Sequence, residues 1–506
     1  MKDLLEIPVL GRMLRSLWTW RLLRLGLLAL LLAMIAYGWN QHAVPGVEVR
    51  DPLMYTSFTT FSLWVVWLMG MVPLILLFGR SWCTVCPVGW LNGLLSRFGL
   101  RRELPDWLDS QLPVTLSLVL LQLLVYFLTV HRFPDYSAVL LAWMLVLTFM
   151  SGLIWKRRAF CLLLCPAGAV MSLYARLAPW QLRVKKVSVC DSCQAKPCLS
   201  TDNRWLQASL GHTRLQWRSP AEGCPVALVP AEIDKSDSCT LCLNCMHSCC
   251  NDNIRLGFRG WPMDLRNGGL RPGEALFFLA LLGLLSANFA KVYVDLREAV
   301  FWLPEQLALA VGWQETGFYL LAVVWLCLLF PLLMMLPGLI VYLVGQVKLC
   351  SATERSALAV PESVSSPVLW GSQGFLGLIG RLALPVLPMV ASAHLSLALV
   401  KLNAKLGYLP LVLKDPSGVK SFLAVSVMQT VPAPGVLISL DLLKWLVVAV
   451  LLVGLGLSAM AAKTIASSSP ADQTGGSRAL LLASLINLCV LGAFYGATVY
   501  EWLFVR

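Results

Sequence analysis

Long apolar segments recur along this chain of 506 residues, and several of them run for 18 or more residues almost without charge. A helix of about 20 apolar residues crosses the hydrocarbon core of a bilayer. Only 13% of the residues are charged, whereas soluble domains are about one quarter charged. The sequence therefore predicts an α-helical polytopic membrane protein with about nine transmembrane helices. They are expected at roughly 22–38, 58–79, 113–130, 137–155, 274–290, 317–346, 382–400, 436–462 and 479–500.

Basic residues indicate how these helices are oriented. Lysine and arginine gather after the second and fourth expected helices, whereas the loops near 39–57 and 131–136 carry only Arg50 and Arg132. Positively charged loops stay in the cytoplasm, so we expect the N-terminus and the polar insert after the fourth helix to be cytoplasmic. Such loops also explain the net charge of +13. Membrane lipid is therefore an expected partner, and nucleic acid is not.

One segment leaves the topology of the last third of the chain open. Residues 317–346 contain Pro331 and Pro337. Because proline removes a backbone donor and bends a helix, this segment forms either one kinked helix or a helical hairpin. A hairpin would invert the direction of every helix that follows it.

A motif of about ten residues occurs twice and predicts a pair of equivalent hairpins. The first copy, Arg80–Gly89, reads R-S-W-C-T-V-C-P-V-G, and the second, Arg158–Gly168, reads R-A-F-C-L-L-L-C-P-A-G. Each copy follows an apolar segment and combines an arginine, an aromatic residue, two cysteines and Pro-x-Gly. The likeness continues to an arginine at the same offset, Arg97 and Arg176. Residues 1–180 are thus expected to form a membrane domain with two repeated hairpins, each ending in a Cys-Pro motif.

The cysteines of this repeat are candidate ligands or redox groups at the membrane surface. If the hairpins pack as pseudo-symmetric repeats, their four sulfurs converge. They would then ligate a third iron–sulfur cluster, act as redox thiols or relay a metal; the alternative is that they are buried structural cysteines. The nearby charges of Arg80 and Arg158 would stabilise thiolates. We call these residues the twin-motif cysteines: Cys83, Cys86, Cys161 and Cys165.

Nine of the sixteen cysteines lie between Cys190 and Cys250, in the insert. Disulfides are rare in the cytoplasm, so clustered cysteines there more commonly bind metal. The run from Cys239 to Cys249 has the spacing C-x2-C-x2-C-x3-C, which is typical of bacterial ferredoxins; its fourth cysteine ligates the other of two clusters. The other half is less regular, with a C-x2-C-x4-C run from Cys190 to Cys198 and a distant Cys224.

Crosswise assignment divides eight of these cysteines into two sets of four, as two [4Fe–4S] clusters require. Zinc is the alternative, since it also takes four thiolates. We therefore expect residues 181–272 to form an inserted cytoplasmic, bacterial-ferredoxin-like (α+β) segment, followed by a C-terminal transmembrane domain of residues 273–506. The first cysteine set is Cys190, Cys193, Cys198 and Cys249. The second cysteine set is Cys224, Cys239, Cys242 and Cys245.

His394 lies inside one of the expected membrane helices, 382–400. An ionisable side chain at that depth is by default a candidate functional residue. It would ligate a metal such as haem iron, hydrogen-bond a quinone or carry protons. The alternative is a structural hydrogen bond between helices.

The paired Cys-Pro motifs on membrane helices, followed by a ferredoxin segment, resemble the NapH/NosR-type membrane polyferredoxins over roughly residues 58–258. The resemblance implies an electron-transfer subunit of an oxidoreductase complex in the bacterial cytoplasmic (inner) membrane. Such a subunit passes electrons between a quinol pool or a cytoplasmic donor and a partner redox protein, such as a reductase or a cytochrome. Quinone is accordingly a candidate further cofactor.

Two other functions use the same clusters. One is an assembly or metal-reduction factor that reduces copper or iron for another protein, although the loops expected outside are poor in His, Cys and Met. The other is a transport subunit driven by electron flow, with the C-terminal helices as its pathway. Co-purifying subunits distinguish these functions from that of an electron-transfer subunit.

Overall fold

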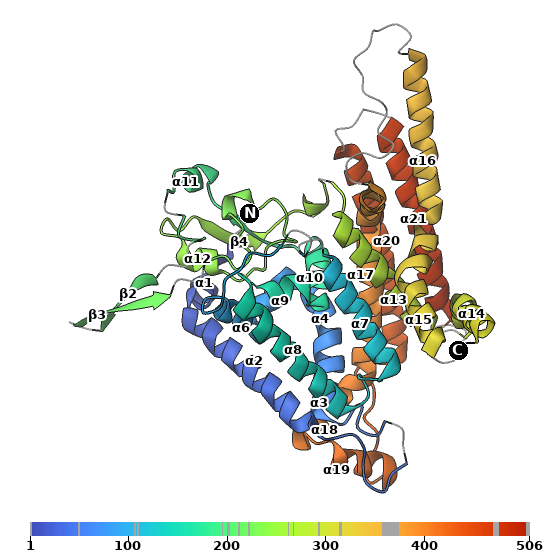
Figure 1. Ribbon diagram of the computed structural model, residues 1–506, viewed down its shortest axis with the longest axis horizontal. Coiled ribbons are helices and arrows are strands. Elements are labelled where there is room, and N and C mark those ends of the chain that lie inside the picture. Colours follow the sequence, from blue (N-terminus) through green and yellow to red (C-terminus); the bar gives the residue numbers. More distant parts are fainter. Residues whose placement is uncertain are drawn as a thin grey trace. The chain divides into compact units, whose positions relative to one another are not determined.

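The computed structural model is mostly helical (Figure 1). It describes residues 3–48, 51–105, 108, 111–156, 158–194, 196–199, 203–210, 213–220, 223–261, 263–266, 268–291, 294–312, 316–356, 374–468 and 475–501. For residues 203–210, 213–220, 316, 348–356 and 475 the backbone alone is described.

Eight helices within these residues are long and apolar enough to cross a membrane. A ninth expected segment forms the shorter apolar helix α7, Leu112–Phe127. The helical, multi-pass architecture is thereby confirmed, and the number of crossings stays a prediction. The eight helices are Leu17–Gly38, Phe58–Val85, Pro134–Ile154, Pro272–Ala290, Gly317–Val347, Gly374–Lys414, Leu440–Ser468 and Gly476–Tyr500.

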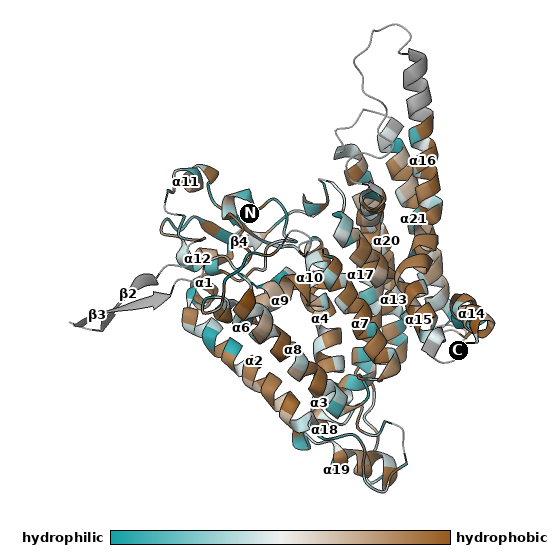
Figure 2. Ribbon diagram, viewed as in Figure 1, coloured by the Kyte–Doolittle hydropathy of each residue, from teal (hydrophilic) through white to brown (hydrophobic). Residues whose placement is uncertain are grey.

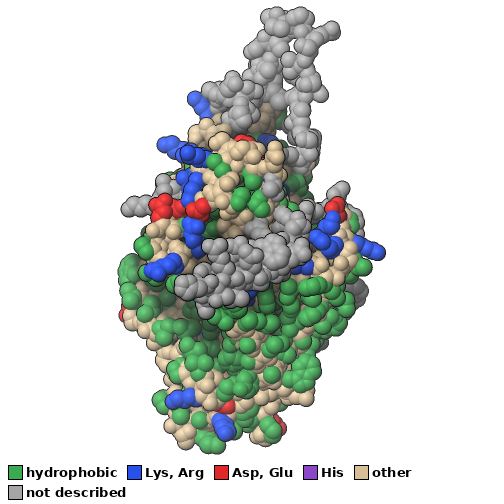
Figure 3. Space-filling view, turned by 90° about the vertical axis from the view of Figure 1, so that its left-hand side faces the viewer, with side chains coloured by type: hydrophobic (Ala, Val, Ile, Leu, Met, Phe, Trp, Pro, Cys, Tyr) green, Lys and Arg blue, Asp and Glu red, His purple; other side chains and the backbone are tan. Residues whose placement is uncertain are grey.

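Many apolar side chains of these helices point outward, as expected where lipid is the solvent. Helix α2, Leu17–Gly38, exposes Leu22, Leu25 and Leu32, and it is coloured as mainly hydrophobic in Figure 2. The face shown in Figure 3 carries a broad area of apolar side chains. An apolar area of this kind on a water-soluble protein would be an aggregation hazard.

The chain divides into two compact units, each built from segments that are distant in sequence. The three-part division along the chain stays a prediction, because these units follow contacts in space. Unit 1 comprises Met1–Ala33, Leu74–Pro105 and Leu141–Asp264. Unit 2 comprises Met34–Pro73, Asp106–Leu140 and Leu265–Arg506.

Unit 1 contains both copies of the repeated motif, and each copy folds into two short helices. The second helix of each pair begins with the proline of the motif, which occupies the first helical position, where its missing N–H is not needed. In the first copy, α4 (Leu68–Phe78) and η3 (Gly79–Ser81) lead to α5 (Trp82–Val85) and α6 (Pro87–Leu95). In the second, α8 (Pro134–Ile154) leads to α9 (Ala159–Leu163) and α10 (Pro166–Ala175).

The insert in unit 1 is an α+β segment built around a two-stranded antiparallel sheet. Strand β1, Trp180–Val184, pairs with β4, Ile254–Phe258, so that Leu182 lies opposite Leu256. Leu182 packs with Leu243 in a small core that also receives Leu5 from the start of the chain. The remaining elements are η1 (Leu4–Glu6), α1 (Pro8–Arg15), α11 (Val187–Asp191), η4 (Pro230–Glu232), α12 (Asn244–Ser248), η5 (Met263–Leu265) and an antiparallel hairpin of β2 (Asn203–Leu210) and β3 (Thr213–Pro220).

Unit 2 is helical. The segment 317–346 forms one kinked helix and not a hairpin, since α15 (Thr316–Val324), a π-helical turn η6 (Trp325–Leu329) and α16 (Phe330–Ser356) follow one another without a break. A further helix, α14 (Val294–Val311), exposes Trp302 and was not predicted. The other elements are α3 (Phe58–Thr60), η2 (Phe61–Trp67), α13 (Pro272–Ala290), α17 (Gly374–Lys405), η8 (Leu406–Tyr408), α18 (Leu409–Lys414), α19 (Val419–Phe422), η9 (Leu423–Val427), α20 (Leu440–Ser468) and α21 (Gly475–Tyr500).

Candidate iron–sulfur sites

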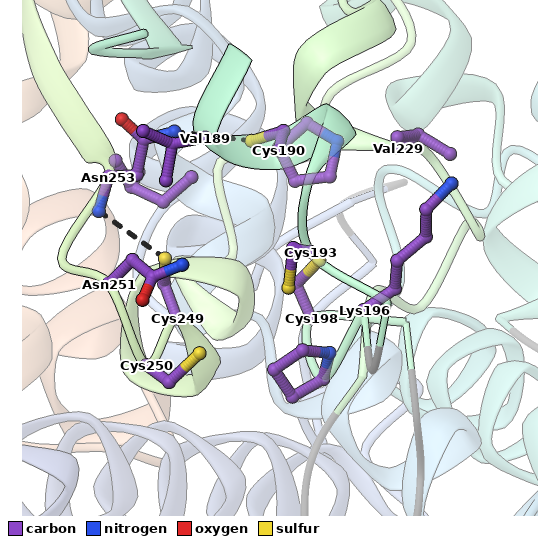
Figure 4. Close-up of a pocket in the computed structure, with 13 residues that line it drawn as sticks. Val189, Cys190, Cys193, Lys196, Cys198, Val229, Cys249, Cys250, Asn251 and Asn253 are labelled. Carbon is purple, nitrogen blue, oxygen red and sulfur yellow. Dashed lines mark hydrogen bonds between the residues drawn. The ribbon is translucent and has the colours of Figure 1, made fainter. Parts of the chain in front are cut away.

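The first cysteine set surrounds one cavity of the insert (Figure 4). Cys190 lies on α11, Cys193 and Cys198 lie in the loop after it, and Cys249 follows the last residue of α12. Lys196 and the exposed Cys250 lie at the edge of the same cavity. The structure thus brings together the four cysteines that crosswise assignment groups.

Asn253 holds two of these sulfurs in place, and sequence reasoning did not single it out. Its side-chain Nδ2 donates to Cys190 Sγ at 3.2 Å and to the carbonyl of Lys186 at 2.7 Å. Its backbone N–H donates to Cys249 Sγ at 3.3 Å (Figure 4). Donors of this kind stabilise charge on sulfur and tune the potential of a bound cluster.

The second cysteine set surrounds another cavity, lined mainly by apolar residues. Cys239, Cys242 and Cys245 are buried. Leu241 and Leu243 adopt φ angles of 49° and 62°, which are uncommon for residues other than glycine. These turns let the chain wrap around the cavity, so that three cysteines of one short run face it. The four cysteines are Cys224, Cys239, Cys242 and Cys245.

The two cavities are neighbours. The Cys224 N–H donates to the carbonyl of Cys198 at 2.9 Å. This hydrogen bond joins a member of the second cysteine set to a member of the first. A single zinc ion would need its sulfurs about 2.3 Å from one point. Nowhere in the described residues do three His, Cys, Asp or Glu side chains lie close enough together to hold one ion. The four cysteines of each set instead line a cavity, and four thiolates are what a [4Fe–4S] cluster requires.

The two copies of the repeated motif have the same local geometry. Cys165 is the N-cap of α10, and its Sγ accepts a hydrogen bond from the Gly168 N–H at 3.3 Å. Cys86 is the N-cap of α6, and its thiol is likewise bonded by the backbone of Gly89. A helix N-terminus favours negative charge, so the glycine of each Pro-x-Gly turn presents a donor to the sulfur of its own copy.

The twin-motif cysteines converge across the repeat. An ideal Cβ built on Gly89 would lie 3.1 Å from Cys161 Sγ, so the first copy directly contacts the second. Cys83 Sγ lies 3.6 Å from the sulfur of Met171 on α10. Burial raises the pKa of the Cys161 thiol well above its ordinary value, and charge on Cys165, Cys86 or Cys83 would raise it further. Charge on any one of the other three sulfurs would thus be felt at Cys161, and binding of a cluster by the four cysteines stays a prediction.

The loops of the insert contact the repeated motif directly. Thr84, between the two cysteines of the first copy, donates from Oγ1 to the carbonyl of Leu241 at 2.7 Å. In the second copy, the Arg158 N–H donates to the carbonyl of Pro225, next to Cys224, at 3.3 Å. The second cysteine set is therefore the part of the insert that adjoins the twin-motif cysteines.

Asp237 organises this contact and was also missed from the sequence. Its carboxylate pairs with Arg176, and both side chains are nearly inaccessible, at 3% and 2% exposure. Its carbonyl accepts hydrogen bonds from Arg80 and from Ser172. An aspartate two residues before Cys239 is a visible signal, but its partners lie 61 to 157 residues away, so spacing alone does not reveal the pairing.

Burial dominates the chemistry of these thiols. It raises the pKa of both Cys165 and Cys239 to about 12, and that of Cys245 well above its ordinary value. Without a metal they would remain protonated at neutral pH, because the charged form is poorly solvated. All fifteen cysteines whose side chains are described are free of disulfides. The donor set thus fits an iron–sulfur cluster, which takes thiolates as ligands and releases their protons.

His394 lies on α17, within unit 2, whereas the three groups of four cysteines belong to unit 1. The His394 side chain is half-buried. Its suggested roles in metal, quinone or proton binding stay predictions.

Comparison with known proteins points to the same chemistry. A family model described as a 4Fe-4S binding domain matches residues 60–105 and 136–189. The chain is 29% identical over 185 residues to the "Putative electron transport protein YccM" of Escherichia coli (strain K12), which covers 31% of this chain and 48% of that relative. The chain thus spans about half the length of this relative. No solved structure matches the chain.

These findings support an iron–sulfur protein of electron transport. The residues matched by the family model contain the twin-motif cysteines and end just before Cys190. The likeness to a 4Fe-4S domain therefore falls on the repeated motif and not on the ferredoxin-type run. The finer resemblance to the NapH/NosR type stays a prediction.

Proposed function

We propose that this chain is a membrane-bound electron-transfer protein with three iron–sulfur clusters. The first and second cysteine sets would each hold a [4Fe–4S] cluster, and the twin-motif cysteines would hold a third. The observation that supports the proposal best is the arrangement of twelve cysteines as three groups of four in unit 1, with the second set adjoining both others. Electron transfer needs such a series of nearby centres.

Each bound cluster would accept and return one electron, and the protein's residues would set how readily that happens. Around the first set, Asn253 donates hydrogen bonds to two sulfurs. Around the second set, Leu182, Val226 and Ile233 line the cavity and keep water away from the sulfurs. The Gly89 and Gly168 N–H groups serve the same purpose as Asn253 at the twin motif.

The order of the three sets suggests which partner would meet each end of the series. The first set has the exposed Cys250 and Lys196 at its edge, so it is the natural contact for a soluble cytoplasmic partner. The twin-motif cysteines lie at or just after the ends of two apolar helices, Phe58–Val85 and Pro134–Ile154, so a quinol or a partner subunit in the bilayer would exchange electrons with this centre. Electrons would pass between a quinol pool or a cytoplasmic donor and a partner redox protein of a complex in the bacterial inner membrane.

Iron and acid-labile sulfide per chain, measured on anaerobically purified protein with EPR after dithionite, test this proposal. Three clusters give about twelve irons per chain. About eight irons would restrict the clusters to the insert and leave the twin-motif cysteines as thiols. Zinc in place of iron, with no EPR signal, would contradict the electron-transfer function.

Single substitutions assign the irons to their sites. Cys161→Ser should remove about four irons and one EPR component if the twin-motif cysteines hold a cluster. Cys242→Ser should remove a different component. Cys489→Ser is the matched control, because Cys489 is an exposed free cysteine on α21 and its loss should leave the iron content unchanged.

A further inference from the structure

The arginines that open the two copies of the repeated motif are buried cations without an acidic partner. Arg80 is 6% exposed and Arg158 is 3% exposed. Neither forms an ion pair with a carboxylate in the part of the chain that the structure describes, and the Nε atom of each is buried without an acceptor there. Two other buried arginines of unit 1 differ: Arg176 pairs with Asp237, and Arg259 pairs with Asp264.

An unpaired buried charge is one of the costliest features a protein can carry. Arginine cannot lower that cost by losing its proton. The negative charge that compensates Arg80 and Arg158 must therefore come from their neighbours, and the nearest candidates are cysteines. Protonated thiols supply no such charge, whereas four thiolates bound to a cluster do.

Each arginine lies between two cysteine groups. Arg158 Nη1 donates to the carbonyl of Cys83 at 3.1 Å, and it lies 3.5 Å from the position of a Cβ on Gly89, a position that is also 3.1 Å from Cys161 Sγ. On its other side, the backbone N–H of Arg158 is bonded to Pro225, next to Cys224. Arg158 thus contacts the first copy through its guanidinium and the neighbour of Cys224 through its backbone.

Arg80 occupies the matching position from the first copy. Its Nη1 donates to the carbonyl of Asp237, two residues before Cys239. Burial raises the pKa of Cys239 and of Cys165, and the Arg80 charge opposes both rises. In the same way the Arg158 charge opposes the rise of the pKa at Cys224 and at Cys161, where burial is again the main cause. The Arg158 charge also acts on Cys86 and Cys83, so the two guanidinium groups act on members of both the twin-motif cysteines and the second cysteine set.

We propose that Arg80 and Arg158 are shared counter-ions of two negatively charged centres, one held by the twin-motif cysteines and one by the second cysteine set. The inference rests on the proposed function, because it needs both centres to be occupied. Each arginine raises the reduction potentials of both centres together, since a nearby positive charge favours the added electron. The first cysteine set, which neither arginine contacts, keeps its own potential.

Redox titration followed by EPR on Arg80→Gln and Arg158→Gln tests this inference in the full-length protein. Removing either charge should make the second-set and twin-motif centres harder to reduce by about tenfold, which is about 59 mV for a one-electron couple. The first-set signal should not move. Arg80→Lys and Arg158→Lys keep the positive charge but lose the planar guanidinium group. Their reduction potentials should therefore lie closer to the wild-type values than those of the glutamine variants. Arg97→Gln is the control, because it also removes one positive charge but from a residue eight positions beyond Gly89 in the sequence.

Comparing the glutamine with the lysine variants separates the effect of the positive charge from that of the planar guanidinium group. Unchanged potentials in both glutamine variants with full iron content would overturn the inference, and so would a shift confined to one of the two centres. If the glutamine variants lose iron from these centres, restoration by lysine supports the counter-ion role, and failure of lysine to restore it overturns that role. Wild-type protein that lacks iron, or lacks the third cluster, would instead contradict the proposed function.

Discussion

The thiol of Cys161, from the second copy of the repeated motif, lies against the bare α-carbon of Gly89 in the first. A methyl group on Gly89 would approach Cys161 Sγ to 3.1 Å, which is closer than ordinary van der Waals contact. One turn further along α6, a methyl group on Gly93 would meet Arg158 at an ordinary 3.5 Å. The glycine of the Pro-x-Gly sequence thus provides room for a sulfur of the other copy.

Gly89→Ala should therefore disturb the twin-motif site while leaving the fold intact. We expect loss of about four irons per chain if this site holds a cluster, because the added methyl group would displace Cys161 Sγ from its position among the four sulfurs. Gly93→Ala is the matched control on the same helix, and it should be neutral or stabilising by up to about 1 kcal/mol, since alanine favours helix over glycine. Equal iron contents in the two variants would contradict the packing argument.

Asp237→Asn should destabilise unit 1 strongly. It leaves the Arg176 guanidinium buried without its partner, and breaking a buried pair in this way costs about 3–5 kcal/mol. Chemical denaturation of the purified protein in detergent measures the change in the free energy of unfolding. The exposed pair Lys156–Glu103 provides the control, with side chains 43% and 82% exposed. Glu103→Gln should change stability by less than about 1 kcal/mol, and a comparable loss in both variants would exclude a special role for Asp237.

The cysteine pattern allowed the grouping of the cysteine side chains to be predicted. The ferredoxin-type run carries its crosswise assignment with it, and the structure gathers Cys249 with the first set and Cys224 with the second. The repeat predicted that the membrane-surface sulfurs converge, because two copies of one motif fold alike. Ligation of iron by these cysteines stays a prediction.

The residues that support the sites could not be found from spacing. Asp237 and Asn253 act through contacts with partners distant in sequence, such as Arg80 and Cys190, and single aspartates and asparagines are common in loops. Helix α14 was missed for another reason, because it is too polar at its start for a membrane span and its apolar residues do not form one long run. Kinking of 317–346 was foreseen from its prolines, but the choice between helix and hairpin depended on packing.

Asn253→Leu should lower the reduction potential of the first-set centre. The variant removes the donor to Cys190 Sγ, although the backbone donor to Cys249 remains. A hydrogen bond that stabilises the more negative, reduced state is worth about 1 kcal/mol, so we expect a negative shift of less than about 59 mV for the one-electron couple. EPR-monitored titration of the first-set signal measures it, and the other centres serve as internal controls. A positive shift, or an equal shift in all centres, would contradict this role of Asn253.

Without its metal, the protein should lose folding stability as the pH rises into the alkaline range. Burial raises the pKa of the Cys165 and Cys239 thiols from an ordinary 9.0 to about 12. Since the folded state binds these protons more tightly than the unfolded state, the resulting stability is fully present below pH 9 and is lost as the pH rises toward about 12. Thermal unfolding of chelator-treated protein in detergent between pH 8 and about 11 should show this loss. The iron-loaded protein should not show it, because its ligand thiols have already lost their protons. For apo Cys165→Ser, stability should fall less steeply with pH than for the apo wild type. If stability fell equally with pH in all three samples, the buried thiols would not be the source of the loss.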